Sequence, residues 1–205
     1  MQKVLVTGAG GFLGQAFVRG FLAAGWRVRA ADLAHVDLGD LAGAGAETTG
    51  MDLTQADSLP PLLKDIDTVV HNAGIFDLSA HPKRLWAVNA DGASLMAEAS
   101  VAARIKRFIM VSSTSVYGRA SLPTREDAPK NPYHDYSASK WAGEKRATEI
   151  CERNGISMAT LRPTLVYGPG SRYGISPVFC LYALARQKRV NPFGVRNGAM
   201  THVVH

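Results

Sequence analysis

The stretch that decides the fold is Thr7-Gly8-Ala9-Gly10-Gly11-Phe12-Leu13-Gly14, in which a glycine stands at every third position from Gly8. A β-rich run, residues 2–7, precedes it, and apolar residues at helical spacing follow it over residues 12–24. Glycine permits a positive-φ turn and leaves room for a pyrophosphate against the backbone at a helix N-terminus. We therefore predict a dinucleotide-binding turn made by Gly8, Gly11, Phe12, Leu13 and Gly14.

The alternation of strand and helix continues along the chain. Further β-rich runs occupy residues 27–31, 47–51, 68–71, 107–112 and 157–161, and helical patterns occupy residues 55–64, 83–103, 135–153 and 178–189. Strands that alternate with helices imply right-handed crossovers and a parallel sheet covered on both faces. The expected fold class is α/β, a doubly wound parallel sheet of the Rossmann type.

Composition excludes several classes of protein. The 205 residues are 46% hydrophobic and 20% charged, the balance of a globular protein. The apolar runs are far shorter than the roughly 20 residues that a membrane span needs, and no signal peptide is evident, so we expect a cytoplasmic protein. Cys151 and Cys180 have no closely spaced Cys or His companions, so neither a disulfide framework nor a metal site is expected, and both cysteines should pack in the core.

The net charge of +6 conceals an asymmetry. Residues 1–100 hold 7 Lys/Arg against 11 Asp/Glu, whereas residues 101–205 hold 16 against 6. A basic second half suits either an acidic ligand or a solvated surface. The basic residues are scattered singly and no aromatic platform is interleaved with them, so we expect no nucleic-acid partner.

Asp32 ends the second predicted strand, 18 residues beyond Gly14. An acidic side chain there accepts hydrogen bonds from both adenosine ribose hydroxyls and repels a 2′-phosphate, which favours NAD over NADP. Arg27, Arg29 and His35 lie nearby and keep a phosphate partner open as the less favoured alternative.

Other candidates for cofactor binding follow the third and fourth strands and the next helix. Asp52 and Leu53 either flank the adenine or belong to a helix N-cap. In His71-Asn72-Ala73-Gly74 the small residues permit close passage of the ribose and nicotinamide, and His71 is expected to be a packed strand end. Asn89 either binds backbone near the cofactor or joins two helices. The resulting candidates are Asp52, Leu53, Asn72, Ala73, Gly74 and Asn89.

The chemical candidates are a phenol and an ammonium on one helix face. Tyr136 and Lys140 stand at i and i+4. A tyrosine with a pKa of about 10 needs a positive neighbour to act as a base near neutrality, and Lys140 can provide it. Ser112-Ser113-Thr114, at the end of the fifth strand, offers a hydroxyl to polarise a substrate oxygen.

Four motifs in order make the chain resemble the extended short-chain dehydrogenase/reductases, the NAD-dependent epimerase/dehydratase family. They are residues 7–14, Ser112-Ser113-Thr114-Ser115-Val116-Tyr117-Gly118, Tyr136 to Lys140, and Leu161-Arg162-Pro163-Thr164-Leu165-Val166-Tyr167-Gly168-Pro169-Gly170. The resemblance implies that Tyr136 is the acid/base, that Lys140 binds the nicotinamide ribose and activates Tyr136, that Ser113 contacts the reacting oxygen, and that Pro163 lies in the cofactor-binding set. It also implies hydride transfer between a substrate carbinol carbon and nicotinamide C4.

Two departures from the family's nucleotide-sugar enzymes bear on the substrate. Those enzymes often have asparagine where this chain has Leu165, and arginine where it has Thr201. The departures shift weight toward less charged substrates such as steroid-like alcohols, although Arg172, Arg189 or Arg196 remain available to a diphosphate. The alternatives are a strict nucleotide-sugar epimerase or dehydratase, and a dinucleotide-binding regulatory protein without turnover.

Domain organisation and assembly complete the expectations. We expect a nucleotide-binding domain with its acid/base residues over residues 1–170, and the start of a truncated or reduced substrate lobe over residues 171–205, because the family continues past the position of His205. Members of the family it resembles frequently pair through the helices that follow the fourth and fifth strands, so the resemblance implies a homodimer through residues 83–103 and 135–153. These residues carry apolar side chains on more than one side; the alternative is burial against the sheet.

Overall fold

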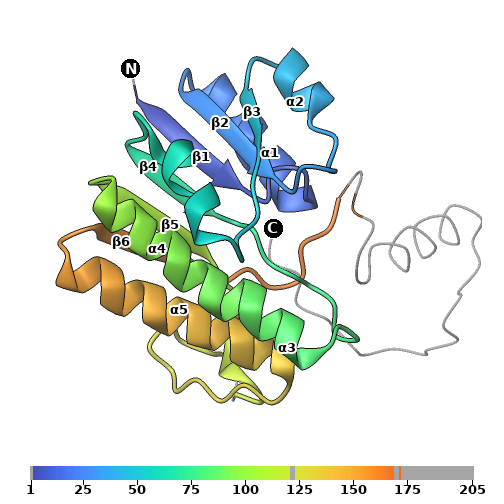
Figure 1. Cartoon of the computed structure of the whole chain (residues 1–205). Coiled ribbons are helices and arrows are strands. Elements are labelled where there is room, and N and C mark those ends of the chain that lie inside the picture. The colour runs from blue at the N-terminus through green and yellow to red at the C-terminus, as the bar shows by residue number, and fades with distance from the viewer. Residues whose placement is uncertain (1, 121–122, 169–170, 172–205) are drawn as a thin grey trace, which may run out of the picture. The chain divides into compact units, whose positions relative to one another are not determined.

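The computed structural model describes residues 2–120, 123–168 and 171. The chain divides into two compact units, residues 1–162 and 163–205. The first unit contains every helix and strand described below (Figure 1). The predicted helix over residues 178–189 and the expected lobe over residues 172–205 lie outside the described residues.

A six-stranded parallel sheet forms the middle of the first unit (Figure 1). Its order is β3-β2-β1-β4-β5-β6, and each neighbouring pair runs parallel. This order reverses direction between β1 and β4, which is where open α/β sheets bind their ligands. The strands are β1 Lys3–Thr7, β2 Arg27–Asp32, β3 Glu47–Gly50, β4 Thr68–His71, β5 Arg107–Val111 and β6 Ser157–Leu161. The predicted Rossmann-type sheet is therefore confirmed.

Helices cover the two faces of the sheet. One face packs against α4 and α5, which lie side by side in Figure 1, and the other packs against α1 and α2. The helices are α1 Phe12–Ala23, α2 Gly39–Gly43, α3 Pro82–Leu85, α4 Gly92–Ala102 and α5 Asp135–Arg153. Short 3₁₀ turns are η1 Ala56–Ser58, η2 Pro60–Leu63 and η4 Thr114–Tyr117, and η3 Trp86–Asp91 is a π-helical turn.

Alternation along β1 separates two hydrophobic cores. Leu5 points into the core under α4 and α5, while Val4 and Val6 point into the core under α1. All three side chains are fully buried. Because successive residues of a strand face opposite sides, an unbroken apolar run is what a central strand of a doubly covered sheet requires.

Two predicted helices differ from what forms. Residues 55–64 make the two 3₁₀ turns η1 and η2, because Pro60 and Pro61 lack the N–H groups that a continuous helix needs. The helical pattern over residues 83–103 is confirmed in outline, but η3 interrupts it between α3 and α4. Single π-helical turns often occur at functional sites, and η3 carries the candidate Asn89.

Within the part of the chain that the structure describes, no helix is long and apolar enough to cross a membrane, and no cluster of His, Cys, Asp and Glu is arranged to hold a metal ion. Cys151 is a buried free thiol in α5, as expected, and burial raises its pKa to about 11, which keeps it protonated and inert. Cys180 lies outside the described residues.

Candidate active site

The glycine turn packs tightly against the end of β4. Gly8 has a φ of +65°, and a Cβ there would lie 2.7 Å from Cα of Ala73. The side-chain amide of Asn72 donates from Nδ2 to the carbonyl of Gly8 at 3.1 Å and links the same two segments. A Cβ on Gly14, in the first turn of α1, would collide with the carbonyl oxygen of Gly8. These contacts bring the N-terminus of α1 up to the carboxyl ends of β1 and β4.

The N-terminus of α1 is an electropositive end without a counter-charge of its own. Gly11 is the N-cap and offers no side-chain cap, and the first turn contains no acidic residue. The N–H groups of Phe12 and Leu13 precede the first helical hydrogen bond, from Gln15 to Gly11. Unpaired N–H groups and the helix dipole together make such an end a site for an anion.

Asp32 ends β2 beside this turn. One carboxylate oxygen accepts from the N–H of Gly10 at 2.8 Å and the other from the N–H of Leu33 at 2.8 Å. A carboxylate has about four lone-pair positions, so each oxygen can still accept a hydroxyl. Asp32 is half-buried and rigidly oriented, and this suits a residue that binds a pair of ribose hydroxyls.

The two arginines that were candidate partners for a 2′-phosphate are placed elsewhere in the structure. Arg29 is buried, and its guanidinium binds Glu47 and the carbonyls of Leu62 and Lys64. Arg27 begins β2, so it lies at the opposite end of that strand from Asp32. Neither arginine is placed to bind a phosphate beside Asp32.

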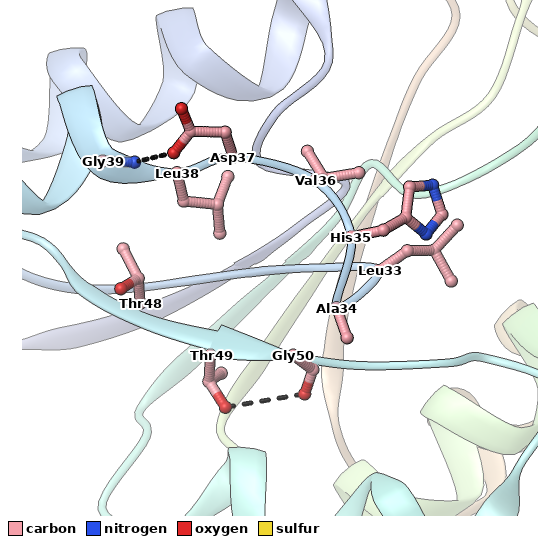
Figure 2. Close-up of a pocket in the computed structure, with 10 residues that line it drawn as sticks. All are labelled: Leu33, Ala34, His35, Val36, Asp37, Leu38, Gly39, Thr48, Thr49 and Gly50. Carbon is pink, nitrogen blue, oxygen red and sulfur yellow. Dashed lines mark hydrogen bonds between the residues drawn. The ribbon is translucent and has the colours of Figure 1, made fainter.

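An open pocket of about 490 Å³ follows Asp32, where a loop passes over the ends of β2 and β3 (Figure 2). Asp37 closes the far end of the loop by accepting from the N–H of Gly39 at 2.8 Å. The described lining holds His35 and neither lysine nor arginine; its residues are Leu33, Ala34, His35, Val36, Asp37, Leu38, Gly39, Thr48, Thr49 and Gly50. His35 is thus the one candidate phosphate partner that stays near Asp32.

His71 is a buried strand end, as expected. Its Nδ1 lies 3.2 Å from Oγ1 of Thr7, and its ring packs against Phe108. Because Thr7 Oγ1 already accepts from the N–H of Ala73, its hydroxyl hydrogen is free to point at the ring nitrogen. Burial, with a smaller effect from the charge of Lys140, lowers the pKa of His71 to about 3, so the ring is neutral near pH 7.

The depressed pKa of His71 predicts an acid-side loss of stability. An unfolded histidine binds a proton near pH 6.5 and the folded one does so only near pH 3, so the free energy of unfolding falls as pH drops below about 6.5. We expect a decrease of about 1.4 kcal/mol from this residue between pH 7.5 and 5.5, measured by urea unfolding. His71→Gln should flatten that dependence while His35→Gln, at an exposed position, leaves it intact; equal slopes in wild type and His71→Gln would refute the account.

Asn89 joins three segments of the chain. Its Oδ1 accepts from the N–H of Ile75 at 2.8 Å, and its Nδ2 donates to the carbonyl of Ile75 at 3.1 Å. Nδ2 also lies 3.2 Å from Oγ of Ser139 in α5. The side chain both orders the backbone just beyond Gly74 and connects η3 to α5.

Asp52 closes a local turn. One of its carboxylate oxygens accepts from the N–H and hydroxyl of Thr54, at 2.9 and 2.8 Å, and these hydrogen bonds lower its pKa. The α-helix that it was to cap, over residues 55–64, does not form. Leu53 is buried and packs against Gly92 at the start of α4.

Ser113, Tyr136 and Lys140 come together where β5 ends and α5 begins. The Ser113 hydroxyl hydrogen-bonds to the Tyr136 phenol, and its Oγ also accepts from the N–H of Ser115 at 3.1 Å. Lys140 Nζ donates to the carbonyl of Val111 at 2.7 Å, and a Cβ on Gly74 would lie 3.5 Å from it. The neighbouring Ser112 is buried, so Ser113 is the better-exposed hydroxyl.

Burial sets the proton affinities of this group. It raises the pKa of Tyr136, and the hydrogen bond from Ser113 opposes that rise. It lowers the pKa of Lys140 to about 8, and the charge of Glu144 opposes that fall. From the sequence we expect Lys140 to act on Tyr136; in this structure Ser113 hydrogen-bonds to the Tyr136 phenol.

Several side chains beside the candidate site were not predicted from the sequence. Glu144 is buried one turn beyond Lys140, and its partner Arg162 lies at the end of β6. The spacing from Lys140 to Glu144 was the available signal for Glu144. Phe76 lies edge-on to Tyr136 with ring centroids 5.1 Å apart, and no periodicity marked it. His134 caps α5 by accepting from the N–H of Ser137 at 3.0 Å.

Pro163 is the first residue of the second unit. Its assignment to cofactor binding stays a prediction.

The chain is similar in sequence to several known proteins. The model of the NAD dependent epimerase/dehydratase family matches residues 4–195. The chain is 31% identical to UDP-glucose 4-epimerase of Vibrio cholerae, over 82% of this chain and 53% of that protein. It is 34% identical to ceramide reductase of Caulobacter vibrioides, over 98% of this chain and 57% of that protein. The chain thus spans about half the length of the curated relatives it matches.

A solved structure extends the comparison to the fold. The Bordetella bronchiseptica enzyme WbmG, in complex with NAD and UDP, superposes with a TM-score of 0.77 at 26% identity, covering 89% of this chain and 59% of that one. The family match over nearly the whole chain, the parallel sheet and the glycine turn lead to one conclusion: the chain belongs to the NAD dependent epimerase/dehydratase family.

Proposed function

We propose that the chain carries the cofactor and acid/base site of an NAD-dependent oxidoreductase that transfers hydride between a secondary alcohol or ketone and nicotinamide C4. The observation that carries the proposal is the convergence of Ser113, Tyr136 and Lys140, with Lys140 Nζ beside Gly74 at the end of β4. That end of the sheet adjoins the glycine turn, so the proton-transfer groups and the dinucleotide turn share one edge.

The residues present fit a dinucleotide. The glycine turn has no side chain that would hold a pyrophosphate away, and the N-terminus of α1 lacks an acidic residue that would repel one. Asp32 presents two oriented carboxylate oxygens next to that turn. NAD, when bound, supplies the hydride acceptor or donor.

Each side chain then has a defined task. Tyr136 takes the hydroxyl proton as the alcohol is oxidised and returns it on reduction. Ser113, already bonded to the phenol, holds the reacting oxygen next to it. The ammonium of Lys140 favours phenolate by its charge and lies beside Gly74, where it can reach a ribose hydroxyl.

Asn72, Ala73, Gly74 and Asn89 form the floor of this site in the proposal. Asn72 and Asn89 are engaged with backbone groups, so their contribution is to hold the chain after β4 in place. Gly74 is exposed and leaves room for a ring to approach. Asp52 and Leu53 are proposed to border the adenine, with Asp52 oriented by Thr54.

Cofactor choice provides a direct test. We expect Asp32→Ala to weaken NAD binding more than NADP binding, because the carboxylate accepts ribose hydroxyls and repels a 2′-phosphate. Titrating each dinucleotide while following the melting temperature measures both affinities. Asp37→Ala, which removes a carboxylate at the far end of the adjoining loop, is the matched control and should preserve the preference. An equal loss of NAD and NADP in Asp32→Ala would contradict the proposed ribose contact.

For the substrate we propose a chemical class. We favour a weakly charged alcohol or ketone, because Leu165 is an exposed apolar residue where nucleotide-sugar enzymes of the family often have asparagine. Nucleotide sugars are the second candidate, since WbmG was solved with UDP. A panel of nucleotide sugars, sterols and small alcohols, followed by NADH absorbance, separates the two. Dinucleotide binding without turnover on any of them would favour a regulatory protein.

A homodimer through α4 and α5 belongs to the same proposal. Apolar side chains on these helices are only partly buried within the chain, among them Leu95, Trp141 and Ile150. Sedimentation velocity of the 205-residue chain tests it, and a monomer at micromolar concentration would contradict it.

A further inference from the structure

Three ionisable side chains lie at successive turns on one face of α5. Tyr136, Lys140 and Glu144 stand at i, i+4 and i+8, and their exposed fractions are 8%, 5% and 2%. Residues at this spacing are neighbours along a helix surface. The first two belong to the proposed acid/base site. Glu144 has no task in it, although a buried carboxylate is costly and needs a reason.

Arg162 supplies the counter-charge of Glu144 from the end of β6. Its Nε lies 3.2 and 3.1 Å from the two carboxylate oxygens, and its Nη2 binds Oε1 as well. The pair is bidentate, which is the strongest and most directional geometry for a guanidinium and a carboxylate. The side chain of Glu144 is 3% exposed and that of Arg162 is 19% exposed, so solvent screens the pair little.

Arg162 also reaches the segment that leads from Ser113 to Tyr136. Its Nη1 donates to the phenol oxygen of Tyr117 at 2.7 Å and to the carbonyl of Glu126 at 3.2 Å. Tyr117 in turn donates to that carbonyl at 3.0 Å. The Glu126 carbonyl accepts a further hydrogen bond from Lys130 Nζ at 2.8 Å. One arginine therefore connects α5, η4 and the chain that enters α5.

We propose that Glu144, held by Arg162, is a positioning residue of the acid/base site, one that keeps Lys140 charged. The inference rests on the proposed function for the role of Lys140, but the effect of Glu144 on the charge of Lys140 can be measured without it. A buried ammonium loses its hydration and releases its proton more readily, and a fixed carboxylate one helical turn away counteracts that loss.

The titratable and charged groups around Lys140 lie on α5, on β4 and just beyond β6. Glu144 and Tyr136 lie on its own helix, His71 lies on β4, and Arg162 enters from β6. His71 is neutral near pH 7, so its ring adds no charge there. Removing the Glu144 carboxylate takes away the stabilising charge and leaves the Arg162 cation unpaired, and both changes disfavour the ammonium. Removing the Arg162 cation leaves Lys140 as the one positive partner of the Glu144 carboxylate among the groups named above, which favours the ammonium.

The two variants should therefore move the titration of Lys140 in opposite directions. In the 205-residue chain labelled with [ε-¹³C]lysine, with the Lys140 signal assigned by its loss in Lys140→Arg, we expect Glu144→Gln to lower the titration midpoint by about one pH unit. Arg162→Gln should raise it. Glu144→Asp, which keeps the charge, should restore most of the wild-type midpoint.

A matched control and a structural check complete the experiment. Glu149→Gln removes an exposed carboxylate from the same helix and should leave the Lys140 midpoint unchanged. A purely structural pair would give the same midpoint in Glu144→Gln as in wild type, or an equal fall in both variants, and either result overturns the proposal. If Glu144→Gln does not fold, Arg162→Gln decides: a rise supports the proposal, while a fall or an unchanged midpoint refutes it.

The outcome is separable from that of the proposed function. The titration needs neither cofactor nor substrate, so absence of turnover would defeat the proposed reaction and leave the Lys140 result standing. Where turnover is found, the pH profile of kcat should shift with the Lys140 midpoint in each variant. A loss of kcat with an unshifted profile would contradict the positioning role.

Discussion

Tyr136→Phe is expected to lower kcat by about 10³-fold, because general acid/base catalysis by a positioned side chain contributes about 10²–10⁴-fold. The phenolic hydroxyl is the only group removed, and it is the group that hydrogen-bonds to Ser113. Its ring also packs edge-on with Phe76, and phenylalanine preserves that packing. The measurement is steady-state turnover on the substrate that the panel identifies, at pH 7 to 9.

The controls for Tyr136 address binding and specificity. NAD affinity in Tyr136→Phe should stay within a few-fold of wild type, measured by thermal shift, because the hydroxyl is not part of the glycine turn. Tyr133→Phe removes a phenolic hydroxyl three residues earlier in the chain. Tyr133 is 66% exposed, and this variant should retain wild-type turnover. Turnover that survives in Tyr136→Phe would rule out the assigned acid/base.

Gly14→Ala is expected to have the largest effect on the dinucleotide turn. The new Cβ would meet the carbonyl oxygen of Gly8, a backbone atom that is held by Asn72 and by the N–H of Gly11. Since neither side can yield easily, we expect a cost at the upper end of the about 1–3 kcal/mol typical of overpacking. Displacement of α1 would also move its N-terminus away from the pyrophosphate, so NAD should no longer raise the melting temperature.

Gly20→Ala is the matched control in the same helix. Nothing lies within 4 Å of a Cβ at Gly20, and alanine is favoured over glycine inside a helix by up to about 1 kcal/mol. This variant should therefore be at least as stable as wild type and should bind NAD normally. Equal behaviour of the two alanine variants would show that close packing at Gly14 does not hold the turn.

Much of the first unit could be predicted from local patterns. Short runs such as Val4-Leu5-Val6 identify central strands because both faces of those strands are covered, and the glycines between β1 and α1 identify the turn because no other residue fits there. The pairing of Tyr136 with Lys140 follows from helical periodicity alone. These inferences depend only on residues that are close together in the sequence.

Other features depend on contacts between segments far apart in sequence. The 3₁₀ turns over residues 56–63 replace the predicted helix, because Pro60 and Pro61 lack the N–H groups that a continuous helix needs. By contrast, no local pattern shows that Arg29 is buried against Glu47 and the carbonyls that follow η2. The same holds for Asn89, whose partners Ile75 and Ser139 lie 14 and 50 residues away.

The sequence by itself determined the sheet-and-helix alternation, the glycine turn between β1 and α1, and the placement of Tyr136 and Lys140 on one helix face, and its four ordered motifs indicated the family. Each of these is written in the order and spacing of residues along the chain. Only the tertiary structure decided what surrounds those residues. It placed Ser113 against Tyr136, put Lys140 on the Val111 carbonyl, and closed the Glu144–Arg162 pair across 18 residues. Burial and charge partners set proton affinities, and they arise from packing between elements that the linear order does not place side by side.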